Sequence, residues 1–319
     1  MTRRRTYWHL ESLQRKPTEY EIATSKLLYY RTHGFEVENP RTDWYERYQK
    51  GSPLQSSDWE RFSDPRQTTY AKYTEIQADK EVFVTGLLAG ADERGTDADL
   101  PGTWLDVLSG ILGPLRYPVH GLQMAAAYVG QMAPSGRITV AALFQTADEV
   151  RRIQHLAMRL HRLRAIRPDF GRQSKETWQN APAWQPWREV IEKLLVTYDW
   201  GEAFVALNLV VKPMFDELFM SHLRRLARRE GDDLLAELLR SLDQDCQWHR
   251  EWSVALVQEL RREEANMVAV RAWLERWRPL ASRAVAAFAF PLGLPSAAQE
   301  IENFCTDYWG AAGLMMDAR

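Results

Sequence analysis

Apolar side chains recur at spacings of three and four residues along most of the chain, which is the pattern of amphipathic α-helices. Stretches that alternate apolar and polar residues, as strands do, are scarce, so the sequence predicts an all-α protein. The clearest stripe is predicted to face a core and consists of Val150, Ile153, Leu156, Ala157, Leu160 and Leu163. The predicted helices cover residues 66–89, 115–133, 138–165, 185–196, 198–229, 232–263 and 266–289.

Breaks between these helices coincide with turn-forming residues. They lie at 134–136 (Pro-Ser-Gly), 168–171, 182–186 and 231–233 (Gly-Asp-Asp). Pro213 is expected to kink one of the longest helices without ending it, because the apolar pattern continues on both sides. Several long helices with short connections favour a helical bundle.

The beginning of the chain has a different composition. Residues 1–75 contain thirteen aromatic side chains but only seven Leu, Ile or Val, and prolines 17, 40, 53 and 65 interrupt any long helix. Aromatic residues anchor protein interfaces. We therefore expect an interface arm at 1–65, a helical domain at 66–290 and a C-terminal extension at 291–319. The alternative is an irregular layer packed on the chain's own helices. The predicted interface residues are Tyr7, Trp8, Tyr20, Tyr29, Tyr30, Trp44 and Tyr45.

Composition excludes several classes of partner and location. The 319 residues include 41 basic and 43 acidic side chains. The chain therefore has no net positive charge that would attract nucleic acid or an anionic membrane. Cys246 and Cys305 lie far apart without a CxxC spacing, which argues against a disulfide framework or a thiolate metal site. The basic start lacks an apolar signal segment, and no stretch is long enough to span a membrane. A cytoplasmic protein is expected.

Motifs for common active sites are missing from the sequence. There is no GxGxxG, GxxxxGK[ST], GxSxG or HExxH pattern, and no ExxH pair, so nucleotide cofactors and hydrolase chemistry are not expected. One arrangement is more informative. Asp245 and His249 are spaced i, i+4, and Asp148 with Glu149 lies in the middle of another helix, as in metal-binding bundles. A complete diiron set needs two ExxH pairs and two further glutamates, which this chain does not supply.

Six collinear stretches carry a resemblance to a known family. They are RKPTEYE (15–21), GLQM (121–124), YVGQMAP (128–134), QTAD (145–148), WGEAFVALNLVVKP (200–213) and WRPLA (277–281). These stretches resemble the β subunits of the hydroxylase component of bacterial multicomponent diiron monooxygenases, of the toluene and alkene monooxygenase type. The resemblance covers nearly the whole chain up to residue 290.

This resemblance implies a ferritin-like helical bundle that acts as a non-catalytic subunit. In that family the hydroxylase is a dimer of αβγ protomers, and the α subunit binds the diiron centre while the β subunit binds no metal. The resemblance also implies an effector protein, a Rieske-type ferredoxin and a flavin reductase as partners, and an NADH-dependent oxidation of aromatic or alkene hydrocarbons.

Aligned with the α subunit's pattern, six positions would be relics of a metal site. Of the original ligands only Glu149 and His249 would remain, since the other positions hold Gln123, Arg152, Lys212 and Cys246. Arg152 follows Glu149 by three residues on the same helical face, so it can neutralise the carboxylate in place of a metal. The alternative is that these are ordinary surface charges.

Two other functions are compatible with the sequence. A freestanding helical oxidase could use Glu149, Asp245 and His249 as metal ligands. A helical adaptor unrelated to oxygenases would also fit the composition. Catalytic, cofactor-binding and metal residues are nevertheless expected to be absent from this chain.

Overall fold

The fold is built from helices alone in the part of the chain that the structure describes. This computed structural model describes residues 8–25, 40–289 and 292–314, and every regular element among them is helical. The predicted all-α class is confirmed for these residues. Among the described helices, none combines the length and apolar character that a membrane span requires.

The main helices are long and follow one another closely along the chain. They are α3 (Tyr70–Arg94), α4 (Gly102–Met132), α5 (Gly136–Ile166), α11 (Asp233–Leu260) and α12 (Glu264–Ala289). A continuous helical run contains α8 (Trp200–Phe204), η6 (Val205–Val211), α9 (Lys212–Asp216), η7 (Glu217–His222) and α10 (Leu223–Arg229). The shorter elements are η1 (Trp8–Leu13), α1 (Glu19–Thr24), α2 (Pro40–Tyr45), η3 (Glu46–Lys50), η4 (Trp59–Arg61), η5 (Thr96–Asp99), α6 (Ser174–Asn180), α7 (Gln185–Leu195) and α13 (Ala297–Ala311).

Side-chain caps fix where several of these helices begin. The side chains of Thr69, Ser135 and Asp232 accept hydrogen bonds from backbone N–H groups in the first turns of α3, α5 and α11. Such caps satisfy donors that have no partner within the helix. Gly231, with φ of +80°, allows the sharp turn between α10 and α11. The predicted breaks at 134–136 and 231–233 are thereby confirmed.

Helix α4 begins well before the predicted start at residue 115. Pro114 and Pro118 lie inside it, although proline normally interrupts a helix because it lacks an N–H donor. Apolar side chains before the first proline, among them Trp104, Leu108 and Leu112, are buried in the core. Their burial keeps the segment helical.

Pro213 lies inside a continuous helical run, as predicted. The run changes from α to π geometry at η6, returns to α at α9, which contains Pro213, and becomes π again at η7. A π turn shifts the hydrogen-bond register and accommodates a residue that cannot donate. Every residue of η6 and α9 is buried, so this run forms the centre of the bundle.

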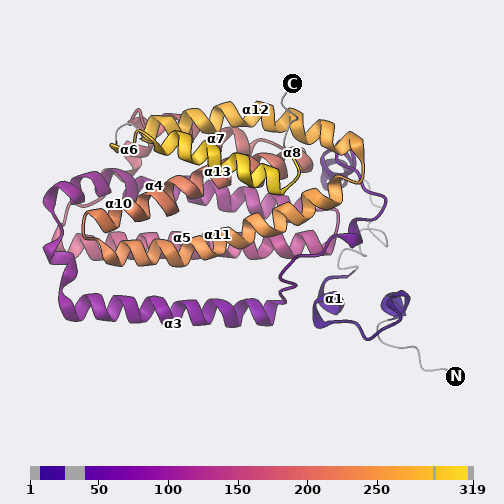
Figure 1. Ribbon diagram of the computed structural model, residues 1–319, viewed down its shortest axis with the longest axis horizontal. Helices are drawn as coiled ribbons and strands as arrows, with labels where there is room; N and C mark the ends of the chain where they lie inside the picture. Colours follow the sequence, from indigo (N-terminus) through magenta and orange to yellow (C-terminus); the bar gives the residue numbers. More distant parts are fainter. Residues whose placement is uncertain (1–7, 26–39, 290–291, 315–319) are drawn as a thin grey trace.

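Helices α4 and α5 form an antiparallel hairpin, and α3 lies along the edge of the bundle (Figure 1). A side chain on Gly130 of α4 would approach Ala142 of α5 to 3.2 Å, which shows how closely the two helices pack. Tyr73 of α3 stacks on Phe144 of α5 with ring centroids 4.5 Å apart. Gln77, Lys80 and Glu81 of α3 make polar contacts with α5 and α11.

The predicted core stripe of α5 is wrong in part. Leu156, Leu160 and Leu163 are buried, but Val150 is 41% exposed and Ala157 is also exposed. The reason is that several charged residues of α5 occupy the side that faces the bundle, which turns some apolar residues outward.

Part of the predicted N-terminal arm packs on this chain's own helices. Leu54 and Phe62 belong to the hydrophobic core, and Phe62 packs edge-on against Trp252 of α11. Tyr20 is 3% exposed, and its hydroxyl accepts a hydrogen bond from the Asp64 backbone N–H. For these residues the alternative interpretation, an irregular layer on the chain itself, is the correct one.

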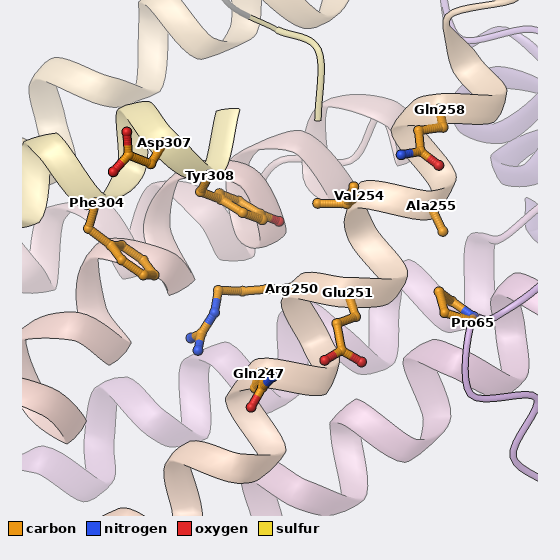
Figure 2. Close-up of a pocket in the computed structure, with 10 residues that line it drawn as sticks. All are labelled: Pro65, Gln247, Arg250, Glu251, Val254, Ala255, Gln258, Phe304, Asp307 and Tyr308. Atoms are coloured by element: carbon orange, nitrogen blue, oxygen red, sulfur yellow. The ribbon is translucent and has the colours of Figure 1, made fainter. Parts of the chain in front are cut away.

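The C-terminal extension contains a helix that the sequence pattern did not predict. Helix α13 packs on α9, η7 and α12, and its Trp309 indole donates a hydrogen bond to the Leu209 carbonyl. Between α13 and α11 lies an open surface groove of about 470 Å³ (Figure 2). The groove is lined by Pro65, Gln247, Arg250, Glu251, Val254, Ala255, Gln258, Phe304, Asp307 and Tyr308.

Candidate functional site

Six side chains from three helices meet in the interior of the bundle. Helix α5 contributes Glu149 and Arg152, α9 contributes Lys212 and Asp216, and α11 contributes Cys246 and His249. Each pair is separated by three or four residues, so both members point from the same face of their helix. All six are at most 3% exposed. We call these six residues the buried ionic cluster.

Two carboxylates and two cations are interleaved in this cluster. Glu149 Oε1 lies 2.6 Å from Lys212 Nζ, and Glu149 Oε2 lies 3.4 Å from Arg152 Nη1. Asp216 accepts hydrogen bonds of 2.8 Å from both Arg152 Nη1 and Lys212 Nζ. Glu149 accepts no well-aligned hydrogen bond from a described residue, so its contacts with the cations are ionic. Because two negative charges face two positive charges, the group is neutral.

Mutual attraction keeps Arg152, Lys212 and Asp216 ionised in spite of their burial. Burial lowers the pKa of Arg152, but Asp216, Cys246 and Glu149 together outweigh burial, so that the pKa lies well above its usual value. The pKa of Lys212 is also raised, against burial and the repulsion of Arg152, by Asp216 and Glu149. Burial raises the pKa of Asp216, but Arg152 and Lys212 bring it below its usual value. Removing any one of these three groups, or Glu149, therefore leaves an unbalanced buried charge.

The other two members of the cluster are uncharged. Burial raises the pKa of the Cys246 thiol well above its usual range even beside Arg152, which donates a hydrogen bond to Cys246 Sγ. Burial, together with Lys212 and Arg152, lowers the pKa of His249 well below its usual value. The imidazole of His249 is therefore neutral at pH 7.

His249 connects the cluster to a second buried network under α3. Its Nε2 lies 2.9 Å from Asp148 Oδ2, and Asp148 Oδ1 accepts hydrogen bonds of 2.8 Å from Tyr73 and Gln77. Burial raises the pKa of Asp148 well above its usual value. The neighbouring Asp245 contacts Gln77, Lys80 and Arg151. Polar side chains thus attach α3 to α5 and α11.

The cluster is poorly suited to holding a metal ion. Iron and similar metals need several free carboxylate, imidazole or thiolate ligands. Here each of the two carboxylates is already engaged by cationic side chains at 2.6 to 2.8 Å. Among the described residues, no group of three or more His, Cys, Asp or Glu side chains is arranged to bind a metal.

The structure brings together five of the six predicted relic positions. Glu149, Arg152, Lys212, Cys246 and His249 belong to the cluster, whereas Gln123 does not. Gln123 is half-buried on α4, and the fully buried positions nearby are the apolar Val119 and Leu122. The alternative interpretation, ordinary surface charges, is wrong because the cluster is buried.

Sequence reasoning missed Asp216. It is the main partner of Arg152 and the second partner of Lys212. The signal was present, because Lys212 and Asp216 are spaced i, i+4 within an otherwise apolar segment, where a pair of opposite charges indicates a buried ion pair.

The predicted interface residues fall into three groups. Tyr20 is buried within this chain and is not available to a partner, which corrects that prediction. Trp44 Nε1 donates a hydrogen bond to the hydroxyl of Tyr128 on α4, and Tyr45 contacts Gln131, yet both remain partly exposed. Tyr7, Tyr29, Tyr30 and the side chain of Trp8 lie outside the described residues.

The neutral His249 predicts a loss of stability in mild acid. In the unfolded chain this imidazole binds a proton near pH 6.5, but in the folded chain its pKa is much lower. The unfolded state therefore binds more protons below pH 6.5, and the contribution to stability that is present above that pH is lost as pH falls.

Between pH 6.5 and 5, the free energy of unfolding of His249→Gln should fall less steeply than that of the wild type, by a difference that approaches about 1.4 kcal/mol per pH unit toward pH 5, where the unfolded imidazole is almost fully protonated. The measurement is urea unfolding at several pH values. The raised pKa of Asp148 acts with the opposite sign, and Asp148 titrates in both proteins. Equal slopes would mean that His249 is charged in the fold.

Comparisons with known proteins agree with this architecture. Residues 44–264 match the family described as Methane/Phenol/Alkene Hydroxylase. The β subunit of the hydroxylase component of the toluene-4-monooxygenase system of Ectopseudomonas mendocina is 39% identical over 292 residues, which are 89% of either chain.

Two solved structures superpose closely on this chain. A chain of toluene 4-monooxygenase with bound toluene has a TM-score of 0.86 and 38% identity, covering 92% of this chain and 97% of that one. A chain of phenol hydroxylase from Pseudomonas sp. OX1 has a TM-score of 0.89 at 20% identity, with coverages of 100% and 98%, and supports the fold alone. These likenesses confirm the predicted ferritin-like, all-helical fold class.

Proposed function

This chain belongs to the methane/phenol/alkene hydroxylase family, as a β subunit of the hydroxylase component of a bacterial multicomponent monooxygenase, and from that premise we propose that it is a structural subunit without an active site of its own. Its role would be to bind and position a catalytic α subunit. The complete enzyme would oxidise aromatic or alkene hydrocarbons with O2 and NADH.

The buried ionic cluster is the observation that carries this proposal. It lies inside the bundle and includes five positions that the family resemblance relates to metal ligands. Arg152 and Lys212 supply two positive charges there, and Glu149 and Asp216 balance them. A metal would add further positive charge to a site that has no uncompensated carboxylate, so these residues do not fit a diiron centre. The diiron centre is expected on the α subunit.

The partners follow from the same premise. We expect α and γ subunits in an (αβγ)2 assembly, served by an effector protein, a Rieske-type ferredoxin and a flavin reductase. We expect no binding to nucleic acid or membranes, since the chain has a formal net charge of -2, and a cytoplasmic location. Membership of the hydroxylase family overturns the alternative of an unrelated helical adaptor.

Iron analysis distinguishes this proposal from a freestanding oxidase that would use Glu149, Asp245 and His249. The chain should be expressed alone in iron-supplemented medium, purified and measured for iron and for hydroxylation of toluene. We expect far less than one iron per chain and no product, because cations occupy the places next to the carboxylates. The catalytic subunit, prepared in the same way, is the positive control. Two tightly bound irons per chain would overturn the proposal.

A further inference from the structure

The guanidinium of Arg250 on α11 differs from those of other shielded arginines in this chain. Five arginine side chains that are 18% exposed or less donate hydrogen bonds to carboxylate or carbonyl oxygens, namely Arg137, Arg151, Arg152, Arg159 and Arg162. The Arg250 side chain is also 18% exposed, but the carboxylate that it pairs with, on Asp243, lies 3.7 Å away, which is too far for a hydrogen bond. Within the described part of the chain, Arg250 donates no hydrogen bond. Its five N–H donors are therefore available to an acceptor from outside.

Arg250 lies in the wall of the groove between α11 and α13 (Figure 2). Its guanidinium carbon lies 5.4 Å from the centroid of the Phe304 ring on α13, and this cation–π contact helps to fix its position. Other parts of the wall are apolar, with the ring of Tyr308 on α13 and the side chains of Val254 and Ala255 on α11. The groove thus combines one cation with aromatic and aliphatic walls.

The two acidic residues that line the groove do not neutralise Arg250. Glu251 accepts a hydrogen bond of 2.8 Å from Arg66, so its charge is already compensated. The carboxylate of Asp307 points away from Arg250 in Figure 2. Asp243 is 29% exposed and forms only the loose ion pair with Arg250, which contributes little in contact with water. A place for one further negative charge remains beside Arg250.

We propose that this groove binds a small aromatic carboxylate, with its carboxylate on the guanidinium of Arg250 and its ring between the walls formed by α11 and α13. A guanidinium matches a planar carboxylate through two parallel hydrogen bonds. The ring of the ligand can pack edge-on or offset against Phe304 and Tyr308. The volume of about 470 Å³ lies in the range of small-molecule sites. The inference goes beyond the proposed function and does not depend on it, because this chain alone forms the groove.

The charges in the groove argue against other classes of small ligand. A phosphate group carries about two negative charges, and Arg250 is the single cation among the residues that line the groove, beside Glu251 and Asp307. A ligand with an ammonium group would be repelled by Arg250. An uncharged hydrocarbon would cover the guanidinium without giving it an acceptor, which costs free energy. An apolar body with one carboxylate satisfies both the walls and the cation.

The test is a calorimetric titration of the purified full-length chain with 4-methylbenzoate. We expect saturable binding of one molecule per chain with a Kd below about 1 mM. 4-Methylbenzamide has the same shape without the charge, and acetate has the charge without the ring. Each of these two compounds should bind at least tenfold more weakly. If the amide binds as tightly as the carboxylate, Arg250 does not recognise the ligand and the proposal fails.

Two variants locate the binding. Arg250→Met removes the charge and keeps a long apolar side chain, so it should weaken the binding of 4-methylbenzoate at least tenfold. Ala255→Trp fills the groove and leaves Arg250 in place, so it should cause a similar loss. The matched controls are Arg271→Met and Ala272→Trp at exposed positions of α12 outside the groove, and both should bind like the wild type. Circular dichroism melting shows that each variant is folded, and if Arg250→Met is not, Ala255→Trp decides.

The remaining outcomes contradict the proposal in different ways. If 4-methylbenzoate does not bind the wild-type chain, the groove is not a site for this class of ligand. If the wild type, Arg250→Met and Ala255→Trp bind it equally, the compound binds elsewhere on the surface. If the wild-type chain is a dimer in solution and Ala255→Trp is a monomer, a second copy of this chain occupies the groove. The proposed structural role is tested separately by the iron analysis.

Discussion

Replacing Glu149 by alanine is expected to lower the free energy of unfolding of the chain by about 3 to 5 kcal/mol, the usual cost of breaking one side of a buried ion pair. The substitution leaves Arg152, Lys212 and Asp216 in the core with one uncompensated positive charge. Equilibrium urea unfolding of the purified chain measures the change. Such a loss is large against a typical total stability of about 5 to 15 kcal/mol.

Two controls show that burial and charge balance are the cause. Glu149→Leu combined with Lys212→Met removes one charge of each sign and leaves the Arg152–Asp216 pair, so it should be far milder than Glu149→Ala. Glu192→Ala breaks an exposed ion pair with Arg188 that has the same 2.6 Å separation, and should cost about 0 to 1 kcal/mol. If Glu149→Ala unfolds at the same urea concentration as the wild type, the cluster is solvated.

Phe62→Ala is expected to cost about 3 to 5 kcal/mol, as other phenylalanine truncations in cores do. Phe62 is 1% exposed and packs edge-on against Trp252 of α11. Its loss leaves a cavity and removes the attachment of the irregular N-terminal layer to the bundle. Thermal and urea unfolding of the purified chain, in the absence of any partner, measures the effect.

The matched control is Tyr70→Ala, which truncates an aromatic residue that is 71% exposed nearby in sequence. It should change the free energy of unfolding by no more than about 0.5 kcal/mol. If Phe62→Ala is equally harmless in the isolated chain, residues 54–62 are not part of its core, and the arm interpretation applies to them after all.

The sequence by itself determined the class of fold and most helix boundaries. Apolar spacing is a local property, and so are the caps at Ser135 and Asp232, which is why these features could be predicted without the structure. The pairing of Glu149 with Arg152 was also predictable, because residues three apart on a helix are neighbours in any tertiary structure. The matched stretches then indicated the family.

Only the tertiary structure decided which face of each helix is buried. The apolar residues of α5 were predicted to face the core, but Asp148, Glu149, Arg151 and Arg152 take that side because α3, α9 and α11 supply their partners. Those partners lie more than sixty residues away in sequence. For the same reason the sequence placed Gln123 in the cluster and missed Asp216.

The tertiary structure also decided which surfaces cover the N-terminal aromatic residues. Composition showed that they need partners but not whether those partners belong to this chain. The structure assigns Phe62 and Tyr20 to the chain's own interior and leaves Trp44 partly exposed. The hydrophobic effect has no preference for one apolar partner over another. The sequence therefore shows which side chains require burial, but which surface buries them depends on how the helices meet in space.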